Sequence, residues 1–190
     1  MIQSKSDLIH YMEQDRVALK VGGIKDFVFH DIWRFQRRLR KAEYWSNSNA
    51  LGAKPIAFLK RRLAYNTGKD LGFSIPINTI GPGLSIAHLG TIVINDKCKI
   101  GENCRIHVCV NIGASASDSS QAPLIGNNCY IAPGAKIYGG IVIGDNTGVG
   151  ANSVVNKSFP DGSITIAGVP AIKISDIGPN EFRSVSNLKE

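Results

Sequence analysis

The chain has 190 residues, a hydrophobic content of 43% and a net charge of +7, which suits one globular domain or one domain with a small addition. No stretch approaches the roughly 18 consecutive apolar residues of a membrane-spanning helix. The first residues carry charges where a secretion signal needs an apolar core, so we expect a cytoplasmic protein.

The charge is unevenly distributed along the chain. Residues 1–72 contain 14 Lys or Arg and 7 Asp or Glu, so the whole excess of +7 lies there, whereas residues 73–190 contain 8 of each. Such an excess can attract an anionic partner, but it is also typical of a solvated helical surface. No nucleic-acid-binding motif accompanies it, and we predict no nucleic-acid partner.

Residues 1–70 have the apolar spacing of helices and form a predicted N-terminal helical region. A first helix is expected to begin after Ser6 and to stop at the Gly22-Gly23 pair. The second is predicted to bury a face made of Ile32, Phe35, Leu39 and Ala42. The third covers about residues 55–65 and ends by Gly68; its predicted buried face consists of Ile56, Leu59 and Leu63.

From residue 71 onward, aliphatic residues recur every six positions. They are Ile80, Ile86, Ile94, Ile100, Ile106, Ile112, Ile125, Ile131, Ile137, Ile143, Val149 and Val155. Four positions after most of them comes a small or modest side chain. Residues six apart lie on different faces of an α-helix, whereas a three-sided coil of parallel strands needs both features. We therefore predict a mainly β fold with a β-helix over residues 71–175.

The six-residue register is interrupted twice. Ile86 and Ile94 are eight residues apart, and the insertion contains the sequence His88-Leu89-Gly90-Thr91. The second interruption is a polar loop of small residues at 113–124, GASASDSSQAPL. Loops that leave a rigid scaffold commonly carry function, so both interruptions are candidate parts of a site.

The four cysteines follow the phase of the repeat. Cys98, Cys104 and Cys129 occupy the inward small position, Cys109 lies one step off it, and no CxxC pair is present. This pattern favours packing in the core over a metal site or a disulfide, and we predict no metal.

The repeats, the IAHLGTIVIN segment, the GASAS…APLIG loop and the TIAGVPAIKI ending together resemble the serine acetyltransferase branch of the hexapeptide-repeat acyltransferases. The resemblance is greatest to its shorter members in capsule and exopolysaccharide gene sets. It implies a left-handed parallel β-helix, acetyl-CoA as cosubstrate, and a homotrimer that could pair into a dimer of trimers. Residues 176–190 would be a C-terminal tail.

The resemblance also implies a catalytic histidine. Acetyl transfer to a hydroxyl needs a base, and a histidine with a pKa near neutrality suits this role. His88 matches the catalytic histidine of the family. One turn of three hexapeptides plus the two inserted residues places residue 108 above His88, about 4.8 Å away. His107 is therefore expected either to lie close to His88 in the active site or to face a neighbouring subunit.

For coenzyme A, the resemblance points to the small-residue turns, whose backbone lets the pantetheine arm approach closely. Matched position by position, the contacts would be Ala114, Pro133, Gly134 and Ala151. Lys173, which follows the GVPA sequence, is a candidate contact for a phosphate group.

The acceptor is less well defined, because the residues that bind serine in the family are replaced. Phe73 and Ala87 stand where two aspartates are expected, and Gln121-Ala122 replaces an Arg-His pair. Losing these charges removes the contacts that select a zwitterion. We therefore expect a sugar hydroxyl of a cell-surface polysaccharide precursor. The alternatives are a serine O-acetyltransferase of cysteine biosynthesis and a non-enzymatic β-helix scaffold.

Overall fold

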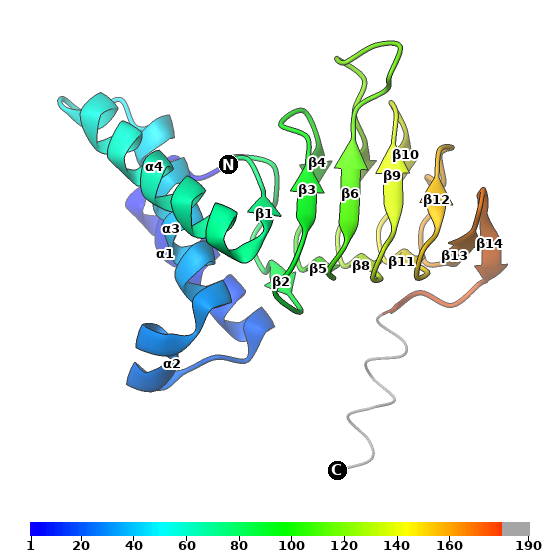
Figure 1. The fold of residues 1–190 in the computed structure, drawn as a ribbon, viewed down its shortest axis with the longest axis horizontal. Coiled ribbons are helices and arrows are strands. Elements are labelled where there is room, and N and C mark those ends of the chain that lie inside the picture. Colours follow the sequence, from blue (N-terminus) through cyan, green and yellow to red (C-terminus); the bar gives the residue numbers. More distant parts are fainter. Residues whose placement is uncertain (180–190) are drawn as a thin grey trace.

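The computed structural model describes residues 1–179; residues 180–190 of the predicted C-terminal tail lie outside that range. The chain begins with helices and continues as short strands that stack away from them (Figure 1). The helices are α1 Lys5–Leu19, α2 Gly23–Phe29, α3 Asp31–Asn47 and α4 Ala53–Leu71. No helix within residues 1–179 is long and apolar enough to cross a membrane.

The predicted start of α1 is wrong by two residues. Ser4, and not Ser6, is the N-cap, because the Ser4 hydroxyl accepts a hydrogen bond from the Asp7 N–H (3.0 Å) and the Asp7 carboxylate accepts one from the Ser4 N–H (2.9 Å). This reciprocal capping box satisfies two backbone donors that the first turn leaves free. The short helix α2, which begins at Gly23 of the Gly22-Gly23 pair, was not predicted.

The helix α4 is longer than predicted and buries a different face. It continues through Gly68 to Leu71, and Gly72 ends it with φ +84°. A Cβ at Gly68 would lie 2.7 Å from the Phe73 carbonyl oxygen, so glycine is needed for close packing there. Leu59, predicted to be buried, is 55% exposed. The buried positions are mostly small, which lets α4 approach its neighbours; they are Ala53, Ala57, Ala64, Thr67 and Gly68.

The strands form three sheets. Sheet A contains, in spatial order, β1 (Phe73–Ser74), β3 (Ile92–Ile94), β6 (Val110–Gly113), β9 (Lys136–Tyr138) and β12 (Val154–Val155). Sheet B contains β4 (Lys99–Ile100), β7 (Leu124–Ile125) and β10 (Val142–Ile143). Sheet C contains β2 (Ser85–Ile86), β5 (Arg105–Ile106), β8 (Tyr130–Ile131), β11 (Gly148–Val149), β13 (Thr165–Gly168) and β14 (Ala171–Ser175).

The chain passes from sheet C to sheet A to sheet B and then repeats, so that three successive strands make one turn of a coil. Pairing is parallel except between β13 and β14. In sheet C, Ile86 pairs with Ile106, which pairs with Ile131, and the twelve aliphatic residues of the repeat are all buried. The prediction of a mainly β fold preceded by helices is confirmed. The aliphatic residues of the repeat form the core of the coil.

Side chains of the helices close the first turn of the coil. Arg40 is fully buried and donates hydrogen bonds to the carboxylates of Asp15 (2.8 Å) and Glu43 (3.0 Å). It also donates to the carbonyl oxygens of Ile80 (2.9 Å) and Gly81 (2.7 Å). These carbonyls belong to the open edge of the first turn, which would otherwise be unpaired.

The helices also form hydrogen bonds to this edge at Leu84, the residue before β2. The Leu84 N–H donates to the Asp15 carboxylate at 2.9 Å, and the Gln36 side-chain amide donates to the Leu84 carbonyl at 2.7 Å. The helices thus take the place of a further turn, and they fix the first turn that leads directly to His88.

Candidate active site

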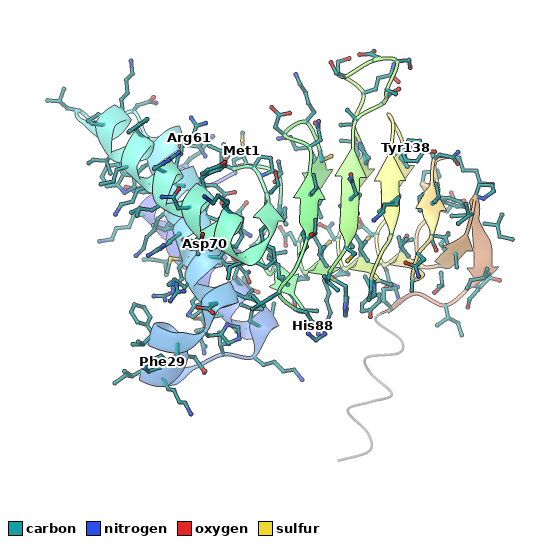
Figure 2. All side chains as sticks on the ribbon, viewed as in Figure 1. Met1, Phe29, Arg61, Asp70, His88 and Tyr138 are labelled. Atoms are coloured by element: carbon teal, nitrogen blue, oxygen red, sulfur yellow. The ribbon has the colours of Figure 1, made fainter. Side chains whose placement is uncertain are left out.

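His88 lies in the insertion after β2, at the corner where the chain passes from sheet C to sheet A. Figure 2 shows it at the edge of the stack, away from Met1 and Tyr138. The side chain is exposed. Within residues 1–179 no side-chain hydrogen bond orients the imidazole, and its ring neighbour is His107, with ring centroids 5.9 Å apart. The predicted proximity of the two histidines is confirmed.

His107 follows the buried Ile106 and lies on the outer face of sheet C. It is nevertheless only 9% exposed, because neighbouring side chains on the same face cover it. Its ring centroid is 4.9 Å from that of Tyr130. Burial lowers the pKa of His107 below its ordinary value, and the charge of Arg105 and the proximity of His88 lower it further. The imidazole is therefore neutral near pH 7.

Arg105 connects this pair of rings to the neighbouring strand. Its Nε donates a hydrogen bond to His107 Nε2 at 3.4 Å, and a terminal guanidinium nitrogen donates to the Ser85 hydroxyl at 3.2 Å. The register explains the grouping, because Arg105 pairs with Ser85 on one side and with Tyr130 on the other.

The sequence analysis missed Arg105 and Tyr130. The signal was available, because each directly precedes an inward isoleucine of the repeat, in the same phase as Ser85. Extending the register that paired His88 with residue 108 would have placed Ser85, Arg105 and Tyr130 in one row beside the histidines.

Three of the five predicted coenzyme A contacts lie on the same corner as His88. The Gly134 N–H donates to the Val108 carbonyl at 3.0 Å, and the Asn152 N–H donates to the Pro133 carbonyl at 2.9 Å. The turns at residues 107–109, 133–134 and 151–152 therefore stack directly on one another. We call this stack of turns, which begins at His88 and includes Ala151, the corner column.

The other two predicted contacts lie elsewhere in the chain. Ala114 follows β6, which crosses sheet A from the corner column to the opposite edge, over four residues or about 13 Å. Figure 1 shows the loop after β6 on the far side of the sheet from the β2 corner. Lys173, in β14, is ion-paired with Asp176. Neither residue lies near His88 in this chain.

The positions predicted to distinguish acceptors hold no charge in the structure. Phe73 is buried and packs edge-on against Phe35, with ring centroids 5.2 Å apart. Ala122 is also buried, and Gln121 is exposed. Phe73 is therefore part of the core between the helices and the first turn, and it cannot orient His88.

Other possible sites do not contain the histidines. Within the described part of the chain, no group of three or more His, Cys, Asp or Glu residues could hold a metal ion. A cavity of about 810 Å³ lies between α4 and β1, with Arg61, Lys69 and Phe73 in its wall, but it includes neither His88 nor His107. As predicted from the repeat, Cys98, Cys104 and Cys129 are buried, while Cys109 is exposed.

Known proteins share both the repeat and the fold. Residues 122–157 match the bacterial transferase hexapeptide family (six repeats). The serine acetyltransferase of Staphylococcus xylosus is 38% identical over 130 residues, which are 66% of this chain and 60% of that protein. That of Staphylococcus aureus strain Mu50 is 34% identical over 142 residues, 74% of this chain and 62% of that protein. The chain thus spans about three-fifths of the length of these relatives.

Solved structures agree with this likeness. The crystal structure of serine acetyltransferase from Brucella abortus strain S19 is 25% identical, with a TM-score of 0.74, and the match covers 91% of this chain and 71% of that one. The complex of the Brucella abortus enzyme with coenzyme A matches with a TM-score of 0.73 at 25% identity, over 92% of this chain and 70% of that one. Residues 122–157 therefore match the repeats of the bacterial hexapeptide transferases, and the chain is similar in sequence and fold to serine acetyltransferases.

Proposed function

We propose that this chain is an acetyl-CoA-dependent O-acetyltransferase in which His88 is the general base. The main support is the corner column, which places His88 and His107 in line with the turns at Pro133-Gly134 and Ala151. Relatives are serine acetyltransferases, and one similar solved structure is a complex with coenzyme A. A non-enzymatic scaffold would have the same stacked turns but would not require two adjacent histidines at this corner.

The reaction would proceed by direct transfer. A nitrogen of the His88 imidazole accepts the proton of the acceptor hydroxyl while the hydroxyl oxygen attacks the acetyl carbonyl carbon. The new C–O bond forms and the C–S bond breaks. The leaving thiolate of coenzyme A takes the proton back from the imidazolium, which restores the base. Catalysis of this kind typically contributes about 10²–10⁴-fold.

We further infer that a second copy of the chain completes the site, in a homotrimer of left-handed parallel β-helices. Ala114 and the loop 113–124 lie across sheet A from His88, so they can meet a corner column only on a neighbouring protomer. Leu124 and Val142 pair in register on the outer face of sheet B and are 49% and 40% exposed. Such an apolar row suits a subunit contact, and light scattering during size exclusion tests the trimer.

Two acceptors have support. The names of the relatives favour L-serine, and none of the relatives named above is a polysaccharide acetyltransferase. The replaced positions favour an uncharged hydroxyl, such as that of a polysaccharide-precursor sugar, because Phe73, Ala87, Gln121 and Ala122 carry no charge where the family has charged contacts to serine. Specificity for serine would then have to come from other groups, of which Arg105 is the cation beside His107.

An acceptor panel tests both parts of the proposal. Acetyl-CoA is incubated with the protein and either L-serine or candidate sugars, and release of the coenzyme A thiol is followed. Turnover of L-serine at millimolar concentration would discard the sugar. Turnover of a sugar without turnover of L-serine would discard the serine alternative.

The role of His88 is tested with a matched histidine. We expect His88→Ala to lower the rate by at least about 10²-fold with any acceptor, while His10→Ala, on the exposed surface of α1, retains the wild-type rate. A His88→Ala protein that keeps its fold and its activity would refute the assignment of the base.

A further inference from the structure

Arg105 and His107 form a hydrogen-bonded pair directly beside His88. The bond runs from Arg105 Nε to His107 Nε2 at 3.4 Å, while the same guanidinium is held from the other side by the Ser85 hydroxyl. His107 is almost fully enclosed, and its ring lies between those of His88 and Tyr130. Arg105 is therefore held by two hydrogen bonds, and His107 is the imidazole that it contacts.

This bond determines which nitrogen of His107 carries the proton. A guanidinium has donors and no acceptor, so the His107 nitrogen that faces it must present a lone pair. The remaining proton of the neutral ring is then on Nδ1. Protonation of Nε2 would break the bond and bring two cations into contact. The ring nitrogen held by Arg105 is thus unable to act as a base.

The groups that surround His107 also favour the neutral form of its ring. From the corner after β2 it faces His88, from the preceding strand β5 it faces Arg105, and from β8 it faces Tyr130. Within residues 1–179 no carboxylate is ion-paired with Arg105 or hydrogen-bonded to His107, so the positive charge beside the ring is not neutralised there. The two histidines consequently differ, because one is exposed and the other is enclosed next to a cation.

We propose that Arg105 is a positioning residue that holds His107 as a neutral hydrogen-bond donor, so that His88 is the single base of the site. His107 would offer its Nδ1–H to substrate and would not compete with His88 for the hydroxyl proton. The role given to His88 rests on the proposed function. The protonation state of His107 follows from its burial, from Arg105 and from His88, and it can be measured without any turnover.

Histidine NMR titration is the direct test, and the chain has only four histidines to assign. In the wild-type protein we expect the His107 ring to stay neutral as the pH falls past 6.5, the usual value. Arg105→Met should raise the His107 midpoint above that of the wild type, as expected from removing a neighbouring cation. Arg105→Lys keeps the charge and should leave the midpoint nearer that of the wild type.

The matched control is Lys99→Met. Lys99 also directly precedes an inward isoleucine of the repeat, but its strand belongs to sheet B. This variant loses the same positive charge away from the histidines, and the His107 midpoint should not move. Equal midpoints in the wild-type protein, Arg105→Met and Lys99→Met would overturn the proposal.

Activity supplies the second measurement. In Arg105→Met, protonation of His107 next to His88 should add a second ionisation to the acid limb of the kcat/KM profile, which becomes steeper between about pH 6 and 7. An unchanged profile together with a shifted His107 midpoint would refute the effect on His88. If instead His88→Ala remained active, the proposed function would fail, while the titration would still decide the state of His107.

Discussion

Replacing Arg40 with methionine should destabilise the protein strongly. Arg40 is completely buried, and it is the cation between the two buried carboxylates of Asp15 and Glu43. Burial alone would lower its pKa, but Glu43 and Asp15 raise it above the ordinary value, so the side chain stays charged. The variant leaves two buried carboxylates without a cation and the carbonyls of Ile80 and Gly81 without this donor.

Removing one partner of a buried ion pair costs about 3–5 kcal/mol. For a chain of this size, each kcal/mol lowers the melting temperature by about 2–4 °C, so we expect a decrease of roughly 6–20 °C. Arg34→Met is the matched control on the same helix. The pair of Arg34 and Asp31 is 40% and 43% exposed, and exposed pairs contribute only about 0–1 kcal/mol.

Urea unfolding followed by far-UV circular dichroism, at one protein concentration, measures both variants. The free energies of unfolding should differ by at least about 2 kcal/mol, which is the gap between the costs expected for a buried and an exposed pair. If Arg40→Met were as stable as Arg34→Met, the buried cluster would not hold the helices on the coil, and our account of the first turn would be wrong.

Three further predictions concern the coil and its corner. Gly134 has φ +77°, and a Cβ there would lie 2.0 Å from a side-chain oxygen. Gly134→Ala should therefore lower the free energy of unfolding by about 1–3 kcal/mol. In the same urea experiment Gly113→Ala should lower it less, because the atom nearest to a Cβ at Gly113 is 3.5 Å away. A thiol reagent should modify only Cys109 in the native protein and all four cysteines in denaturant, because Cys98, Cys104 and Cys129 are buried. Burial also raises the pKa of Cys98 to about 11. Rapid reaction of more than one native thiol would contradict this. The pKa of His107 is lowered from 6.5 on folding, so the unfolded chain binds more protons at this residue, and the resulting contribution to stability is present above pH 6.5 and lost as the pH falls below it. The urea midpoint should therefore fall less between pH 7 and pH 5 in His107→Gln than in the wild-type protein. An equal fall in both proteins would count against this prediction.

The six-residue period of the coil could be predicted because the interior requires an aliphatic side chain at the same position of every repeat. A residue such as Ile131 must be aliphatic wherever neighbouring turns stack on it, and this leaves a regular trace in the sequence. The corner that holds His88 could be predicted for the same reason, since an insertion shifts the register visibly. Position within the repeat also predicted that His107 lies close to His88 or faces a neighbouring subunit, and the first is what the structure shows.

The helices were less predictable because their packing does not follow hydropathy. The buried face of α4 is made of small residues such as Ala57 and Ala64, and the larger Leu59 lies outside. Arg40 is one of several arginines on α3, and nothing in the sequence distinguishes Arg40, which is completely buried, from the others. Arg105 is similar, since its importance comes from the turn stacked on it and not from its neighbours in the chain.

The bonds that α1 and α3 make to residues 80–84 also have a consequence for self-association. A stack of parallel strands with free ends is a template on which another such stack can grow, as in a filament. Arg40, Asp15 and Gln36 occupy one end of the ladder, and at the other end the reversed direction of β14 interrupts the parallel register. The helical region thus blocks the addition of further strands at this end of the stack, and it also supports the turn that leads to His88. Its loss would favour end-to-end polymers over discrete oligomers.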